Sequence, residues 1–146
     1  MERRYPVILH QFGYRRNSGG QGKYTGGNGV IRDIEFLEEI NISLLTERRA
    51  RAPYGLAGGD DAKTGVNTWY KQPMQKGGKV RKVNLGGKAT VKFGPNDRLV
   101  LETPGGGGWG RKEERTEKES VPAGRMPWEA RGSLAEKAAA DAAFGA

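Results

Sequence analysis

Hydrophobic and polar residues alternate most regularly in the segment Ile40–Thr46, where polar residues separate three aliphatic ones. A period of two residues is typical of a β-strand that buries one face. The segment before it, Val30–Leu37, is rich in β-branched and aromatic residues, and only Glu38 and Glu39 lie between the two. The pattern therefore predicts a β-hairpin made of these two segments.

Further segments have the composition of short strands, with glycine-rich or turn-forming residues between them. They are Val7–Phe12, Val66–Lys71, Lys79–Leu85, Lys88–Phe93 and Arg98–Thr103. Gly77-Gly78 supplies one turn and the residues 94–97 supply another. About seven strands, with no helical period before residue 110, predict an all-β fold. We expect a small sandwich or barrel-like antiparallel sheet with long glycine-rich loops.

Glycine and charge both divide the chain near residue 110. Of 24 glycines, 21 precede residue 111. The whole net charge of +8 also falls there, because residues 1–110 contain 18 Lys and Arg against 10 Asp and Glu, whereas residues 111–146 contain seven of each. A basic chain can bind nucleic acid or another polyanion. A basic glycine-rich β module that binds such a partner without catalysis therefore stays open as an alternative function.

The same division predicts three regions. Residues 1–110 form the β segment, and residues 111–132 form a charged linker that contains Pro and Gly. Residues 133–146 contain a short Ala-rich helix, since Ser133 and Glu136 have the spacing of a capping box and Ala is the best helix former.

The chain offers few side chains for catalysis. It has no Cys, and its one His, His10, lies in a predicted strand, where we interpret it as an ordinary strand residue. The acidic residues are scattered, so no metal site is predicted, and no nucleophile motif is present. No apolar run approaches the roughly 18 residues of a membrane helix, and the N-terminus lacks a signal-peptide pattern. We expect a soluble, cytoplasmic protein.

The run Thr-Pro-Gly-Gly-Gly-Gly-Trp-Gly at residues 103–110 raises the question of phosphate binding. It lacks the Lys and the hydroxyl residue of a Walker loop, and no βαβ unit accompanies it. Because missing side chains let another backbone pack closely, we interpret the run as a close-packed turn that ends a strand. Nucleotide binding is the alternative. The other glycine cluster, Ser18–Gly29, is interpreted as a hairpin loop, with RNA binding as its alternative.

The segment Thr46–Gly55 carries the densest charge at the end of a predicted strand. Glu47 provides a carboxylate, and Arg48, Arg49 and Arg51 provide guanidinium groups that suit carboxylates or phosphates. One interpretation is an internal Glu–Arg network that closes a long loop. The other is a site that faces an anion, since loops at strand ends often carry function.

Taken in order, three stretches resemble one known family. They are RYPVILHQFGYRRNSGGQGKYTGGNGVIRDIEF, LLTERRARAPYGLAGG and VNLGGKATVKFGPNDRLVLETPGGGGWG, and they lie within residues 3–110. Together they resemble the C-terminal end of the hydantoinase B/oxoprolinase family. RYPVIL and the TERR…PYGL block are most similar to its ATP-dependent 5-oxoprolinase branch. An N-methylhydantoinase or a ketone carboxylase subunit stays open.

The resemblance implies an enzyme that opens the lactam of 5-oxoproline with ATP to give glutamate, in the cytoplasm and as part of glutathione metabolism. It implies that ATP and Mg²⁺ bind outside this chain, in a hydantoinase A-like region, with no cofactor in the chain itself. That region and an N-terminal hydantoinase B-like region are the expected partners, without a membrane or nucleic acid. Full-length members are expected to be homo-oligomers, and this fragment is expected to be inactive alone.

The resemblance places no catalytic residue on this chain, and the catalytic residues stay unknown. The residues expected to contact substrate or the missing domains are Glu47, Arg48, Arg49, Gly105, Gly106, Gly107 and Gly108.

Overall fold

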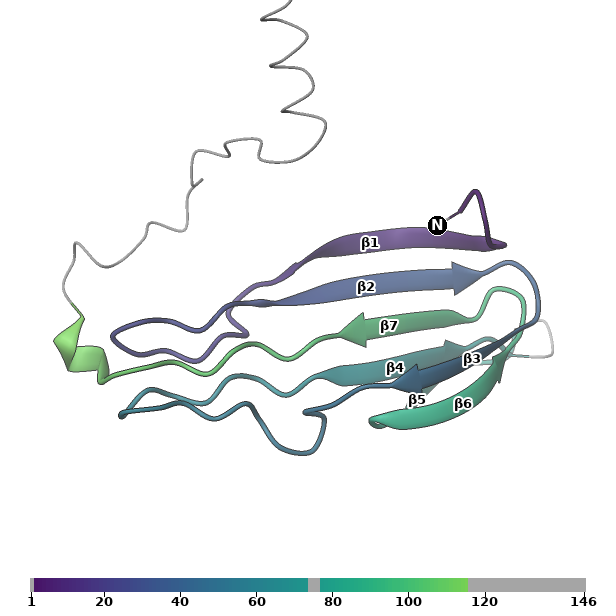
Figure 1. The fold of residues 1–146 in the computed structure, drawn as a ribbon. Coiled ribbons are helices and arrows are strands. Elements are labelled where there is room, and N and C mark those ends of the chain that lie inside the picture. The colour runs from purple at the N-terminus through teal and green to yellow at the C-terminus, as the bar shows by residue number, and fades with distance from the viewer. Residues whose placement is uncertain (1, 74–76, 116–146) are drawn as a thin grey trace, which may run out of the picture.

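The computed structural model describes residues 2–73 and 77–115, and it shows two layers of antiparallel strands (Figure 1). The elements of these residues are β1 (Val7–Arg15), β2 (Gly29–Phe36), β3 (Ile40–Leu45), β4 (Val66–Lys71), β5 (Arg81–Asn84), β6 (Lys88–Phe93), β7 (Arg98–Glu102) and the short 3-10 helix η1 (Lys112–Glu114). The all-β prediction is confirmed. The helix expected within residues 133–146, and most of the linker expected over 111–132, lie outside the described residues.

The larger layer is a five-stranded sheet in the order β1-β2-β7-β4-β5, and the smaller layer pairs β3 with β6. All these pairs are antiparallel. The pairing of β1 with β2 confirms the hairpin loop predicted at Ser18–Gly29, of which only Gly29 belongs to β2. β4 and β5 also pair as neighbours, on either side of the predicted turn at Gly77-Gly78.

The predicted hairpin of Val30–Leu37 with Ile40–Thr46 is wrong. Both segments are strands, but β2 pairs with β1 and β7, and β3 pairs with β6 in the other layer. Residues 37–39 therefore carry the chain from one layer to the other. The alternation of side chains specifies which face of a strand is buried, whereas it does not specify the partner strand.

The core lies between the two layers and is centred on aromatic rings. Phe93 of β6 is fully buried, and Phe36 and Leu99 of the five-stranded sheet are 2% exposed. The Phe93 ring lies 4.6 Å from that of Phe36 and 5.1 Å from that of Trp69, centroid to centroid. Such contacts add to the hydrophobic stabilisation of both layers.

Beyond the strands, three extended segments run side by side at one end of the sandwich (Figure 1). They are residues 18–29, 53–63 and 104–110, and we call them the glycine end. Backbone hydrogen bonds join them directly, as from Gly20 N to Gly106 O at 2.9 Å and from Gly108 N to Asp60 O at 2.9 Å. The glycine end is therefore an ordered continuation of the sandwich, adjacent to the Arg-rich loop that follows β3.

Candidate functional site

The Arg-rich loop leaves the end of β3 through a fixed turn. Thr46 donates to Gly87 O from both its backbone N and its Oγ1, each at 2.8 Å. Two residues later Arg48 adopts a φ of +60°, in the left-handed region that a residue with a Cβ rarely occupies. The Arg48 carbonyl then accepts a hydrogen bond from Gly65 N at 2.9 Å, which attaches the loop to the start of β4.

Arg49 turns back into the protein and joins a polar network. Its Nη2 donates to Asn67 Oδ1 at 2.9 Å, and its Nη1 donates to the Glu47 carbonyl at 2.5 Å. Asn67 is fully buried, and its Nδ2 donates to Thr46 Oγ1 at 2.8 Å and to Gly86 O at 2.7 Å. These bonds connect the end of β3, the start of β4 and the β5–β6 turn.

Burial is the largest influence on the Arg49 guanidinium. Desolvation lowers the pKa of Arg49, the positive charge of Arg15 lowers it further, and the charge of Glu47 partly raises it again. Arg49 Nε is buried and finds no partner among the described residues. The side chain therefore acts mainly as a structural clamp, with its donors directed inward.

The predicted internal network is present, but its chemistry differs from the predicted Glu–Arg pairing. Glu47 contributes its backbone carbonyl, and among the described residues its carboxylate forms no ion pair. The acceptor that completes the network is the side-chain amide of Asn67. Sequence inspection missed Asn67, because one Asn in a predicted strand carries no recognisable signal.

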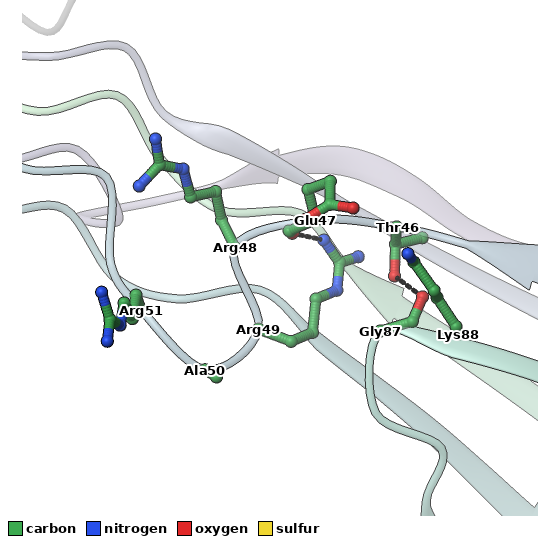
Figure 2. Close-up of a pocket in the computed structure, with 8 residues that line it drawn as sticks. All are labelled: Thr46, Glu47, Arg48, Arg49, Ala50, Arg51, Gly87 and Lys88. Carbon is green, nitrogen blue, oxygen red and sulfur yellow. Dashed lines mark hydrogen bonds between the residues drawn. The ribbon is translucent and has the colours of Figure 1, made fainter.

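An open hollow of about 800 Å³ lies outside this network (Figure 2). Its lining residues are Thr46, Glu47, Arg48, Arg49, Ala50, Arg51, Gly87 and Lys88. Figure 2 shows the Arg48 and Arg51 side chains directed away from the Arg49 guanidinium, which lies beside Glu47. The hollow carries more positive than negative charge, no His is among the described residues that line it, and the Thr46 hydroxyl donates to Gly87 O. Its chemistry suits contact with an anionic group or an acidic surface.

The predicted residues Gly105–Gly108 lie in the central segment of the glycine end, packed against backbone on both sides. A Cβ at Gly105 would lie 2.1 Å from Ser18 O, and one at Gly107 would lie 1.9 Å from Tyr54 O. These distances require glycine, and they support the interpretation as a close-packed segment. Tyr54 links the two predicted groups, since its ring also lies 5.7 Å from the Arg48 guanidinium carbon.

Phosphate binding by the glycine run does not fit this geometry. A phosphate loop needs backbone N–H groups free to face the ligand, yet the N–H groups of Gly105, Gly106 and Gly108 donate to carbonyls of Lys63, Gly27 and Asp60. Trp109 and Gly110 donate in the same way. The following helix, η1, has only three residues.

His10 has a partner that the sequence did not reveal. Its Nε2 lies 2.5 Å from Glu35 Oε2 across the β1–β2 pair, with both side chains partly exposed. Within residues 2–73 and 77–115 no group of three or more His, Cys, Asp and Glu side chains could hold a metal ion. These ranges also contain no helix long and apolar enough to cross a membrane.

The sequence model of the hydantoinase B/oxoprolinase family matches residues 1–112, and the chain belongs to this family. The 5-oxoprolinase of Saccharomyces cerevisiae is 48% identical over 113 residues, which are 77% of this chain and 8% of that protein. The protein C11D3.15 of Schizosaccharomyces pombe is 47% identical over 138 residues, covering 93% of this chain and 10% of its own length.

A solved structure is also similar. The ATP-dependent caprolactamase from Pseudomonas jessenii matches with a TM-score of 0.64 and 21% identity, over 81% of this chain and 20% of that one. This likeness shows the fold. The chain spans about a tenth, or less, of the length of the two relatives above, so similarity covers one part of much longer proteins. The match over 93% of the chain also extends past residue 112, the last residue of the family match.

Proposed function

We propose that this chain is the C-terminal β part of a 5-oxoprolinase, an enzyme that hydrolyses 5-oxo-L-proline to L-glutamate with ATP in glutathione metabolism. The observation that supports this most strongly is the 48% identity to the 5-oxoprolinase of S. cerevisiae over 77% of the chain. The cytoplasm is the compartment we propose for it. In the same proposal residues 111–132 are a linker and 133–146 contain a helix.

The chain alone is proposed to be inactive. Its hollow is lined mainly by cationic side chains and holds no paired nucleophile and base among the described residues, and the His10–Glu35 pair lies elsewhere, on the β1–β2 pair. We assign the chain a supporting role, in which the side of the sandwich with Glu47, Arg48 and Arg49 meets the rest of the polypeptide or the anionic substrate. Gly105, Gly106, Gly107 and Gly108 contribute by fixing the shape of the adjoining glycine end.

The described residues do not fit ATP with Mg²⁺. The N–H groups of the glycine run already donate to protein carbonyls, and residues 2–73 and 77–115 supply no cluster of acidic ligands. The proposal therefore assigns ATP and Mg²⁺ to a hydantoinase A-like region outside this chain. An N-terminal hydantoinase B-like region is the second proposed partner, within a homo-oligomer.

A complementation experiment tests this function. The 146-residue chain is co-expressed with S. cerevisiae 5-oxoprolinase that lacks its matching 113-residue segment, and ATP-dependent release of glutamate from 5-oxoproline is measured. We expect activity from the pair and none from either polypeptide alone. Hydrolysis by this chain alone, or equal hydrolysis by the shortened enzyme alone, would contradict the proposal.

Variants of the hollow test the proposed contact. Arg48→Ala and Arg51→Ala should each lower the restored activity about fivefold, because an exposed charge contact contributes up to about 1 kcal/mol. Arg81→Ala is the matched control, since Arg81 is exposed on β5 away from the hollow. If the two hollow variants restore activity as fully as the control, the contact assignment is wrong and the family function is unaffected.

The alternative function from the basic charge is tested separately. A nucleic-acid-binding module should shift single-stranded RNA in a gel, with an affinity that falls steeply as salt is raised. We expect no shift at physiological salt. Tight, salt-sensitive binding would favour the alternative over the enzyme fragment.

A further inference from the structure

The smaller layer leaves part of the larger sheet uncovered. In Figure 1, β3 and β6 lie over the half of the five-stranded sheet that contains β4 and β5. At the end of β2, Phe36 packs against Phe93 of β6, whereas much of β1 and β2 extends beyond the smaller layer. A groove of about 360 Å³ marks this boundary. Its walls are mainly apolar and include Ile40, Ile42 and Leu44 of β3, opposite Val7, Ile34 and Leu101 of the larger sheet, and Arg32 is the one charged residue among the described residues that line it.

The groove runs along β3, because residues of β3 line it and residues of β6 do not. Among the described residues β3 pairs with β6 alone, so its other edge is unpaired. The bond from Thr46 N to Gly87 O continues the β3–β6 register and fixes which residues bond across it. Since hydrogen-bonded pairs alternate in an antiparallel ladder, Ile40, Ile42 and Leu44 bond to β6.

It follows that the backbone groups of Asn41, Ser43 and Leu45 face the unpaired edge of β3. That edge is unprotected: Leu45 is 78% exposed, and no Lys or Pro lies within the strand. The outer edge of β6 differs, because its residues at the corresponding positions are Lys88, Thr90 and Lys92. Lysines are a common protection of edge strands, so the two edges of this small layer are not equivalent.

We propose that the groove receives an extended segment from the rest of the hydantoinase B/oxoprolinase polypeptide, which pairs with the edge of β3 as an added strand. The inference rests on the proposed function only for the source of this strand. The added strand directs alternate apolar side chains into the groove, and its main chain bonds to Asn41, Ser43 and Leu45. The second layer then extends over β1 and β2.

The occupant is the remainder of a longer protein because this chain spans about a tenth, or less, of the relatives described above. A second copy of this chain does not fit. Its own β3 already packs against its own five-stranded sheet, and that sheet would collide with the apolar face that the added strand must cover.

A pair of proline variants tests the proposal in the co-expressed complex with shortened S. cerevisiae 5-oxoprolinase. Ser43→Pro removes an N–H from the groove edge of β3, whereas Thr90→Pro removes the N–H of its cross-strand neighbour on the opposite edge. Co-purification of the two polypeptides should fall at least tenfold with Ser43→Pro and stay within twofold with Thr90→Pro. Equal effects of the two variants would overturn the proposal.

Hydrogen exchange on the wild-type chain decides the case if a proline variant fails to fold. In the complex the amides of Ser43 and Leu45 should exchange at least tenfold more slowly than in the isolated chain. The exchange rates of the Thr90 and Lys92 amides should differ by less than twofold between the complex and the isolated chain. Unchanged exchange at Ser43 and Leu45 would overturn the proposal. So would a dimer of the isolated chain that Ser43→Pro abolishes, because the strand would then come from a second copy.

The two proposals fail separately. A complex that is sensitive to Ser43→Pro but releases no glutamate contradicts the enzymatic function and leaves the added strand in place. If a folded Ser43→Pro chain assembles fully and restores full activity, the proposed added strand is contradicted and the proposed function is unaffected.

Discussion

The guanidinium of Arg49 donates to the side-chain oxygen of Asn67 at 2.9 Å, across 18 positions of sequence. This bond separates the arginines of the loop into two kinds. Arg49 is half-buried and directed inward, whereas Arg48 and Arg51 are exposed. The sequence presents all three as candidates for an anion, and the fold uses one of them to hold the loop against β4.

Replacement of Arg49 by Lys should therefore destabilise the chain. A Lys keeps the charge but cannot present two planar N–H donors to Asn67 and the Glu47 carbonyl together. We expect urea unfolding to show a loss of about 2 kcal/mol, typical of a broken hydrogen bond to a charged group. Arg51→Lys, on the exposed side of the same loop, should change the free energy of unfolding by less than about 0.5 kcal/mol.

The bond between Arg49 and Asn67 can be isolated by a double-mutant cycle. Asn67→Leu, Arg49→Ala and the double variant should show a coupling free energy of about 1 kcal/mol or more. Substitutions within one hydrogen-bond network do not have additive effects on the free energy of unfolding. The same cycle between Asn67 and Arg51 serves as the reference and should give a coupling near zero. Additive losses for Asn67 and Arg49 would show that the clamp does not contribute to stability.

Two adjacent glycines test the packing of the glycine end. A Cβ on Gly26 would lie 1.9 Å from Gly106 O, whereas one on Gly27 would meet nothing within 4 Å. Gly26→Ala should lower the free energy of unfolding by about 3 kcal/mol through overpacking. Gly27→Ala should leave it unchanged or raise it by up to about 1 kcal/mol, because Ala restricts the unfolded chain. Similar thermal stabilities for the two variants would contradict the close packing.

The sequence predicts the strands of this fold well, because each strand follows from local composition and from turns such as residues 94–97. It predicts only part of the pairing: β1 pairs with β2 and β4 with β5 across the predicted loops, whereas β2 does not pair with β3. β2 and β3 adjoin in sequence yet lie in different layers, since a three-residue link can either reverse the chain within a sheet or carry it to the other layer. The Arg49–Asn67 bond was unpredictable for a related reason: it exists only once β4 lies beside the end of β3. The close packing of the glycine run was interpreted correctly, because the absence of a Cβ is itself a local property, whereas the expected turn is an extended segment bonded to its neighbours.

Two phenylalanines in predicted strands, Phe93 and Phe12, differ in burial. Phe93 is fully buried between the layers, while Phe12 on β1 is 60% exposed, with the Arg32 guanidinium carbon 5.0 Å from its ring. Phe93→Ala should cost about 4 kcal/mol, as expected for truncation of a buried aromatic residue. Phe12→Ala should cost less than about 1 kcal/mol, because its contacts are exposed. Chemical unfolding of both variants checks this difference.

Arg48 combines a left-handed φ with an exposed side chain, and we predict that this side chain serves a contact and not stability. A non-glycine residue in this region costs about 1 kcal/mol, and the exposed Arg48–Tyr54 contact returns a similar amount. Arg48→Gly should therefore keep the free energy of unfolding within about 1 kcal/mol of wild type. Arg48→Val should destabilise the chain by about 2 kcal/mol, because a β-branched residue fits a positive φ poorly.

In the complementation assay the Arg48→Gly chain should still fold and yet restore less glutamate release than the Arg81→Gly control. Full restoration by Arg48→Gly would show that the strained arginine is not part of the contact.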